Sequence, residues 1–202
     1  MTDRQEEPGA STMPHHPVVE QIERAAATTG VLIAGIGAEQ WKLPTPCADW
    51  DVTALVNHLV GGINLYVGGS TGVDPGKAHE DDWLGDDPVA AYRSAAAADL
   101  AAWRRPGALD RSVTIPLGEL PGEFAATVHL TELAVHGADI AVATGQEHLL
   151  DTELLEGLLA AIRELGVDPY RAPGIFGPEA PVAEDAPVHQ RLLAHLGRQV
   201  ES

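Results

Sequence analysis

The chain is poor in cysteine, aromatic residues, basic residues and long hydrophobic runs, and each shortage excludes a class of protein. Its single cysteine excludes an internal disulfide and a zinc site built from cysteines. Aromatic residues make up only 4% although 45% of residues are hydrophobic, so alanine, leucine and valine must form the core. Such a composition favours packed helices over a β-sandwich.

The charge balance excludes a second group of functions. The chain has 12 lysines and arginines and 30 aspartates and glutamates, which gives a formal net charge of −18. This negative charge argues against binding to nucleic acid phosphates or to anionic lipid. No apolar run reaches the ~18 residues of a membrane span, and no charged-then-apolar leader opens the chain. We therefore expect a cytoplasmic protein with neither nucleic acid nor membrane as a partner.

The 202 residues suit one domain. Residues 1–16 are polar and contain His15 and His16, and we expect them to form a disordered N-terminal tail. The remaining residues, 17–198, form the predicted domain.

Apolar residues recur at helical spacing in six segments of that domain. The predicted helices cover about 17–36, 52–68, 88–105, 123–144, 151–165 and 187–198. Alanines on one face of the third helix (Ala91, Ala95, Ala98 and Ala102) predict close approach to a neighbour. Residues 111–117 are β-prone, and Gly118–Gly122 is predicted to be a turn. The fold class is all-α: a four-helix bundle with a short β-prone connector and a small C-terminal helical extension.

The fourth predicted helix carries one polar stripe. His129, Glu132 and His136 share a face at spacings of three and four, and Asp139 continues it. The rest of the circumference is apolar or small, which is typical of a buried helix. Glu132 and His136 are one turn apart and can reach a single ion. The alternative to a metal site is that the polar stripe is simply the solvent-facing side of this helix.

A third candidate ligand, His58, lies on the second helix. Alone it is a partly exposed helix histidine, but with Glu132 and His136 it makes a set of two histidines and one glutamate. Catalytic zinc sites use three such ligands and keep one position open. Cys47 could be a nucleophile, but it has no base in its local sequence, and we interpret it as a small filler.

Three stretches resemble one family. The first is Thr45-Pro46-Cys47-Ala48-Asp49-Trp50-Asp51-Val52 together with Asn57-His58-Leu59-Val60-Gly61-Gly62. The second is residues 129–145, which contain His129, Glu132, His136-Gly137 and Asp139. The third is the end of the chain, from Phe176-Gly177-Pro178 to Leu196-Gly197-Arg198. Together they resemble the short actinobacterial members of the mycothiol-dependent maleylpyruvate isomerase-like proteins. These belong to the DinB-like superfamily of four-helix metalloproteins.

The resemblance implies a divalent metal, most often Zn²⁺, held by His58, Glu132 and His136. His129 lies two turns from His136, and we expect it to support the ligands or to line the pocket. Asp139 would either orient a ligand or cap a buried polar group. Mycothiol would be the thiol cosubstrate, activated by the metal for attack on an electrophilic substrate in a transferase or isomerase reaction. We expect a monomer or a homodimer whose partners are these small molecules.

Two departures from the family pattern bear on the reaction. Ala138 stands where the family often has tryptophan, and 202 residues leave no room for the second, C-terminal domain of the isomerase itself. The resemblance therefore supports the metal site more strongly than it supports maleylpyruvate isomerisation as the reaction. A metal-dependent hydrolase and a non-catalytic metal-binding or regulatory bundle are the alternatives.

Overall fold

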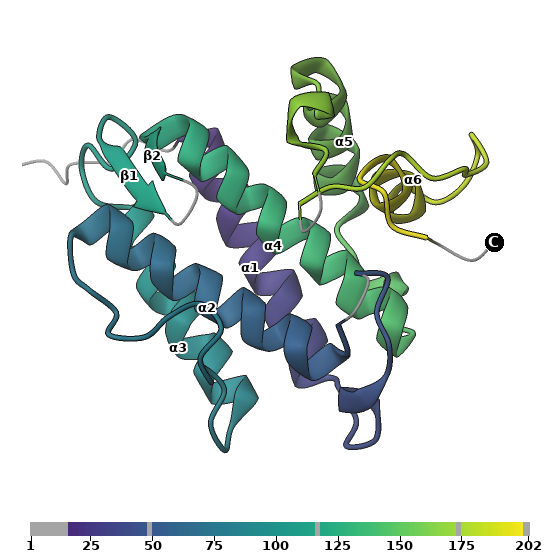
Figure 1. Ribbon diagram of the computed structural model, residues 1–202, viewed down its shortest axis with the longest axis horizontal. Helices are drawn as coiled ribbons and strands as arrows, with labels where there is room; N and C mark the ends of the chain where they lie inside the picture. The colour runs from purple at the N-terminus through teal and green to yellow at the C-terminus, as the bar shows by residue number, and fades with distance from the viewer. Residues whose placement is uncertain (1–15, 48–49, 116–117, 173–174, 200–202) are drawn as a thin grey trace, which may run out of the picture.

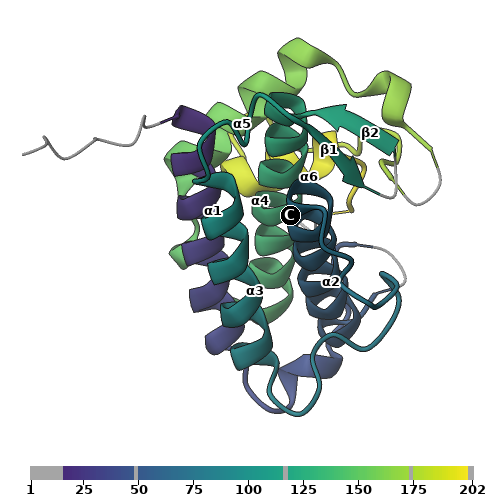
Figure 2. The ribbon, with the colours of Figure 1, turned by 90° about the vertical axis from the view of Figure 1, so that its left-hand side faces the viewer.

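The computed structural model describes residues 16–47, 50–115, 118–172 and 175–199, so all of the predicted tail at 1–16 except His16 lies outside the described residues. Its four long helices are α1 (Pro17–Ala34), α2 (Val52–Thr71), α3 (Pro88–Trp103) and α4 (Gly122–Thr144). Helices α1 and α2 each pack against both α3 and α4, and Figure 2 shows the four side by side. The prediction of an all-α four-helix bundle is confirmed.

The helix ends follow from local sequence signals. The Asp51 side chain accepts a hydrogen bond of 2.8 Å from the Ala54 amide at the start of α2. Asp87 accepts one of 2.9 Å from the Ala90 amide at the start of α3. Such caps satisfy amides that have no partner within the helix. Helix α4 ends at Gly145, whose φ of 72° is the left-handed conformation that glycine adopts without strain.

Helix α4 is the central element of the bundle. Most of its residues from Ala125 to Ala141 are buried, on every side of the helix. Gly137 permits the close packing of α1, because a Cβ there would lie 2.7 Å from the Thr29 hydroxyl oxygen. Within the described part of the chain, no helix is both long and apolar enough to cross a bilayer.

Two smaller units pack on the outside of the bundle (Figure 1). The strands β1 (Ser112–Ile115) and β2 (Gly118–Pro121) form an antiparallel hairpin that lies against α2, with Val113 paired to Leu120. At the C-terminal end, α5 (Thr152–Leu165) packs on α6 (Val188–His195), and α6 contacts α4. Short 3₁₀ turns occur at Gln40–Lys42, Glu147–Leu149 and Asp168–Tyr170. The prediction of a turn over Gly118–Gly122 was wrong, because most of that segment pairs as β2.

The predicted contact face of α3 was also wrong in part. Ala98 is exposed, and the buried face contains Tyr92, Asp99 and Trp103 together with Ala95 and Ala102. Alanines occur on both sides of this helix and therefore do not mark its inner face. A charged residue, Asp99, is only 1% exposed, which alanine spacing could not reveal.

Candidate metal centre

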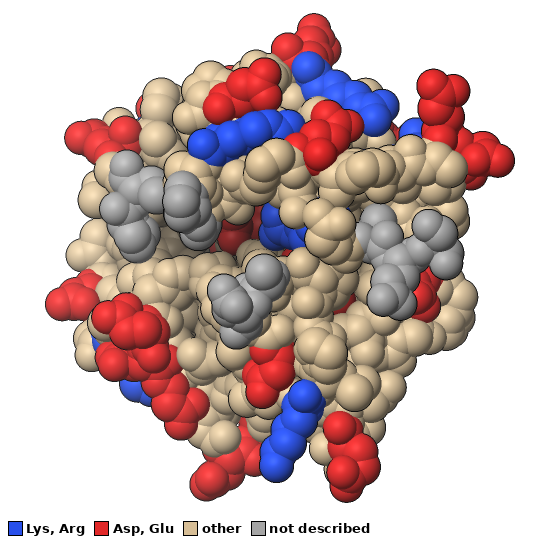
Figure 3. All heavy atoms as spheres, turned by 45° about the vertical axis from the view of Figure 1, so that its right-hand side comes forward, with Lys and Arg blue, Asp and Glu red and all other residues tan. Residues whose placement is uncertain are grey.

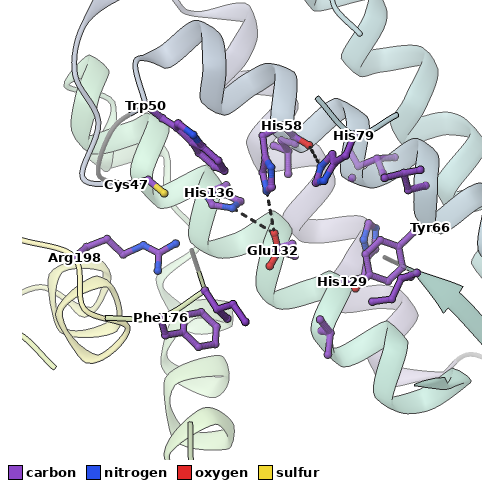
Figure 4. A pocket seen from close by; sticks show the side chains of 17 residues that line it. Cys47, Trp50, His58, Tyr66, His79, His129, Glu132, His136, Phe176 and Arg198 are labelled. Atoms are coloured by element: carbon purple, nitrogen blue, oxygen red, sulfur yellow. Dashed lines mark hydrogen bonds and ion pairs between the residues drawn. The ribbon is translucent and has the colours of Figure 1, made fainter. Parts of the chain in front are cut away.

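The three predicted ligands come together where α2 and α4 lie side by side (Figure 4). The Nε2 atom of His136 lies 3.3 Å from Oε2 of Glu132, and Nε2 of His58 lies 3.6 Å from the same oxygen. One ligand atom from each of the three residues lies within 4.8 Å of the others. A single carboxylate therefore stands between two imidazoles from different helices.

Glu132 and His136 each stabilise the charged form of the other. Burial opposes ionisation of Glu132, but hydrogen bonds and charge from His136 and His58 outweigh it and hold its pKa well below the usual range. Burial likewise opposes a charge on His136, yet Asp139 and Glu132 raise its pKa to about 9. Burial lowers the pKa of His58. The donor set of two imidazoles and one carboxylate fits a divalent cation, which would replace the proton that His136 carries.

Asp139 fixes the orientation of His136. Its Oδ2 lies 3.1 Å from Nδ1 of His136 and accepts the hydrogen bond from that nitrogen, and the carboxylate is completely buried. The arrangement leaves Nε2 of His136 directed at Glu132. A carboxylate behind a metal-binding imidazole commonly sets its tautomer and basicity. The carboxylate of Asp139 also lies 3.5 Å from Nε of Arg198.

His58 is held between two other rings. Its centroid lies 4.3 Å from that of Trp50 and 4.4 Å from that of His79. Nε2 of His79 is 3.0 Å from the backbone oxygen of His58, within hydrogen-bonding distance. Gly61 makes room for this loop, because a Cβ there would lie 2.8–2.9 Å from Trp83 and His79. These contacts restrict the rotamers of the His58 side chain.

His129 is turned away from these three residues. Its Nε2 lies 2.9 Å from Oδ2 of Asp99 on α3, and both side chains are 1% exposed. Its ring packs on Tyr66, with centroids 4.4 Å apart. Among the described residues, the candidate ligand sets do not include His129.

A pocket of about 250 Å³ opens beside the three ligands. Figure 3 shows a hollow in this face with an acidic and a basic side chain inside it. The walls are largely apolar, and helices α2 and α4, the connector before α2 and the C-terminal segment all contribute to them. The lining residues include Cys47, Trp50, His58, Leu59, Ile63, Tyr66, His79, Ile115, Val128, His129, Glu132, His136, Phe176 and Arg198.

Comparison with known proteins gives the family. Residues 22–141 match the model of the mycothiol maleylpyruvate isomerase N-terminal domain. The chain belongs to this family. It is also 36% identical over 181 residues to an uncharacterized protein of Mycobacterium tuberculosis, found in strains CDC 1551 and H37Rv, covering 88% of this chain and 96% of the relative. No solved structure gives a significant match.

The matched segment contains most of the pocket but not all of it. His58, Glu132, His136, His129 and Asp139 lie within the mycothiol maleylpyruvate isomerase N-terminal domain. Phe176 and Arg198 line the same pocket from beyond that domain. The C-terminal segment therefore completes one wall of the site.

Sequence reasoning overlooked several pocket residues and also Asp99, which lies outside the pocket lining and pairs with His129. Asp99 and Tyr66 sit in helices that were interpreted only for their apolar periodicity, and Arg198 was noted only as part of a closing motif. Cys47, interpreted as a filler, lines the pocket, and its sulfur lies within 4.8 Å of ligand atoms of His136 and Asp139. The one available signal was the lone carboxylate of Asp99 among the alanines of α3, since an isolated acid in an apolar helix needs a partner.

Proposed function

We propose that this protein binds one divalent metal ion, Zn²⁺, through His58, Glu132 and His136, and that it catalyses a thiol-dependent reaction. The observation that carries the proposal is the carboxylate of Glu132 placed between two imidazoles in the wall of a pocket. Two histidines with one carboxylate are a ligand set that catalytic zinc sites use, with one position left for a ligand.

The thiol in this proposal is mycothiol, which the family name suggests. A dication held by two neutral imidazoles and one carboxylate supplies net positive charge, which favours a thiolate over a thiol. The chain then needs no nucleophile of its own. Asp139 keeps His136 in one tautomer, Trp50 and His79 hold His58, and the apolar walls exclude water around the sulfur.

The reaction class in this proposal is attack of the thiolate on an electrophilic carbon. If the thiol remains attached, the product is a conjugate and the protein is an S-transferase. If the thiol leaves again after bond rotation, the product is an isomer. The same pocket serves both outcomes, because they share the step in which the carbon–sulfur bond forms.

Metal analysis is the first test. Purified protein should hold about one zinc per chain by elemental mass spectrometry, and His58→Ala should hold close to none while keeping its helical circular dichroism. His148→Ala is the control, because His148 lies exposed in the 3₁₀ turn Glu147–Leu149. Full occupancy in His58→Ala would show that the ligand assignment is wrong.

Thiol binding is the second test. Cobalt in place of zinc gives a reporter, because a thiolate beside cobalt adds an absorption band in the near ultraviolet. Mycothiol is titrated into the cobalt protein between about pH 6 and 9. We expect the band already near the lower end of this range, well below the pKa of ~8.5 that is typical of a cysteine thiol. Absence of the band with metal retained would contradict thiol activation, and turnover without thiol would indicate a hydrolase.

A further inference from the structure

The α2–α3 loop, residues 72–87, folds back against α2 beside the candidate ligand His58. Nε2 of His79 in this loop lies 3.0 Å from the backbone oxygen of His58, and a Cβ at Gly61 would lie 2.8–2.9 Å from the rings of His79 and Trp83. Glycine permits this close approach because it has no side chain. The loop therefore rests directly on the turn of α2 that begins at the candidate ligand.

Asn57 attaches the α2–α3 loop to α2 through both ends of its side-chain amide. Its Nδ2 donates a hydrogen bond of 3.0 Å to the backbone oxygen of Asp81, and its Oδ1 accepts one of 2.8 Å from the backbone amide of Trp83. A carboxamide can donate and accept, whereas a carboxylate only accepts and an alkyl group does neither. Asparagine is therefore suited to bind two backbone groups of opposite polarity in the same loop.

Hydrogen bonds inside the α2–α3 loop connect this attachment to His79. The indole nitrogen of Trp83 donates a hydrogen bond of 3.0 Å to the backbone oxygen of Ala78, and the backbone amide of Ala78 donates one of 2.8 Å to the side chain of Asp81. Ala78 directly precedes His79. The two loop residues that Asn57 binds are therefore the same two that hold the residue next to His79.

The two candidate histidine ligands are oriented by different means. Asp139 forms a hydrogen bond with Nδ1 of His136, which is a common way to orient a metal-binding imidazole. Among the described residues, none forms a hydrogen bond with Nδ1 of His58. The side chain of His58 is also 25% exposed, against 6% for that of His136. The orientation of His58 therefore depends on the neighbours that contact its ring.

Those neighbours are Trp50 and His79, with the ring of His58 between them (Figure 4). The centroid of the His58 ring lies 4.3 Å from that of Trp50 and 4.4 Å from that of His79. In this position Nε2 of His58 lies 3.6 Å from Oε2 of Glu132. Trp50 belongs to the connector before α2, so His79 is the contact that the α2–α3 loop controls.

We propose that Asn57 is a positioning residue for the metal centre: it fixes the α2–α3 loop, and the loop in turn orients the ring of His58 through His79. This inference rests on the proposed function, because the group that is positioned is a proposed metal ligand. Asn57 itself contacts neither metal nor substrate in this account. A ligand that is already held in place binds an ion more tightly than a mobile one, because less conformational entropy is lost on binding.

Zinc affinity measures the consequence of this attachment, by competition with a chromogenic chelator. Asn57→Ala should raise the Kd for zinc about three- to tenfold, which is less than the effect of about 10–100-fold that is typical for a group bonded directly to a ligand. Asn64→Ala is the matched control, because Asn64 is also half-buried on α2 and its Nδ2 donates a hydrogen bond of 2.8 Å to the backbone oxygen of Val60 within the helix. It should leave the Kd unchanged.

A double-mutant cycle tests whether Asn57 acts through His79. His79→Ala should raise the Kd for zinc at least as much as Asn57→Ala, because it removes the ring that Asn57 helps to place. The double variant should have about the same Kd as His79→Ala alone, since the attachment then has no ring to position. If the effects of the two substitutions multiply, Asn57 acts by another route and the inference is overturned. An unchanged Kd in Asn57→Ala would overturn it as well.

Proton NMR of the metal-free protein separates this inference from the proposed function. The Hε1 resonance of His58 senses the ring currents of its neighbours, so in Asn57→Ala it should move in the same direction as in His79→Ala, and it should stay in place in Asn64→Ala. If the wild-type protein binds no zinc but this resonance moves, the metal function fails and the positioning of His58 stands. If zinc binds but Asn57→Ala changes neither the resonance nor the Kd, only the inference on Asn57 fails.

Discussion

Helix α4 carries two imidazole–carboxylate clusters that lie two turns apart and differ in almost every physical respect. In the first, Asp99 bonds His129 one to one, and both side chains are 1% exposed. In the second, Glu132 is shared by His58 and His136, and its side chain is 39% exposed at the pocket. Both clusters combine imidazole with a carboxylate. The arrangement of partners and access to the pocket distinguish them.

The difference shows how one helix can combine a closed pair with an open site. The Asp99–His129 pair uses one carboxylate oxygen for one nitrogen and sits between α3 and α4, where no ion needs to enter. Glu132 has two imidazoles directed at one oxygen, and the three residues together form a group that could hold a metal ion. Two histidines on the same polar stripe can therefore have different roles. The carboxylate that each histidine contacts, Asp99 for His129 and Glu132 for His136, distinguishes these roles.

The largest expected effect is on metal affinity, and it should separate the two histidines of α4. His136→Asn should weaken zinc binding by more than about 100-fold, because a direct ligand matters more than the groups that support it. His129→Asn should keep close to one zinc per chain. Competition with a chromogenic chelator measures both, and loss of zinc in His129→Asn would erase the proposed distinction.

The carboxylates behind the two histidines should differ in the same way. Asp99→Asn should lower the free energy of unfolding by about 1.5–3 kcal/mol, because it replaces the carboxylate that pairs with His129 in the core by a neutral amide. Asp139→Asn should instead weaken zinc binding by about 10–100-fold through the orientation of His136. Urea unfolding and chelator competition on each variant give the two readouts. A stability loss without any zinc effect in Asp139→Asn would count against its supporting role.

The pH dependence of stability should change sign with metal. In the metal-free protein the pKa of His136 is raised to about 9, so its contribution is fully present below about pH 6.5 and is lost as pH rises through 9. This contribution is at most about 3 kcal/mol. Zinc requires the neutral imidazole, so the zinc-loaded protein should gain metal-dependent stability over the same range. Thermal unfolding of both forms from pH 6 to 9 tests this, and parallel slopes would argue against His136 as a ligand.

The smallest expected effect concerns Cys47. It lines the pocket close to His136 and Asp139, but it is outside the set formed by His58, Glu132 and His136. Cys47→Ser should keep the zinc content and change thiol-dependent turnover by no more than severalfold. Near-complete loss of activity with normal folding and zinc would assign a direct chemical role to this residue.

The sequence predicted the bundle because its signals are local. Helical periodicity, the caps at Asp51 and Asp87 and the glycine at 145 located α2, α3 and the end of α4 to within a few residues. The i, i+4 spacing paired Glu132 with His136, whereas His58 was added from the expected bundle and from the family resemblance. The partner of His129 could not be predicted, because Asp99 lies 30 residues away on a helix whose alanines conceal its inner face.

The wall formed by Phe176 and Arg198 has a consequence for how such a protein can diversify. The ligand-bearing side of the pocket is made by α2 and α4, which also carry much of the hydrophobic core, so substitutions there would disturb folding and chemistry together. The opposite wall comes from a segment outside the family domain, in which Phe176 is only partly buried although Leu192, Leu193 and Leu196 belong to the core. Under the proposed function, substitutions at Phe176 should therefore alter selectivity for electrophiles at less cost to the bundle than substitutions in the helices that carry His58, Glu132 and His136.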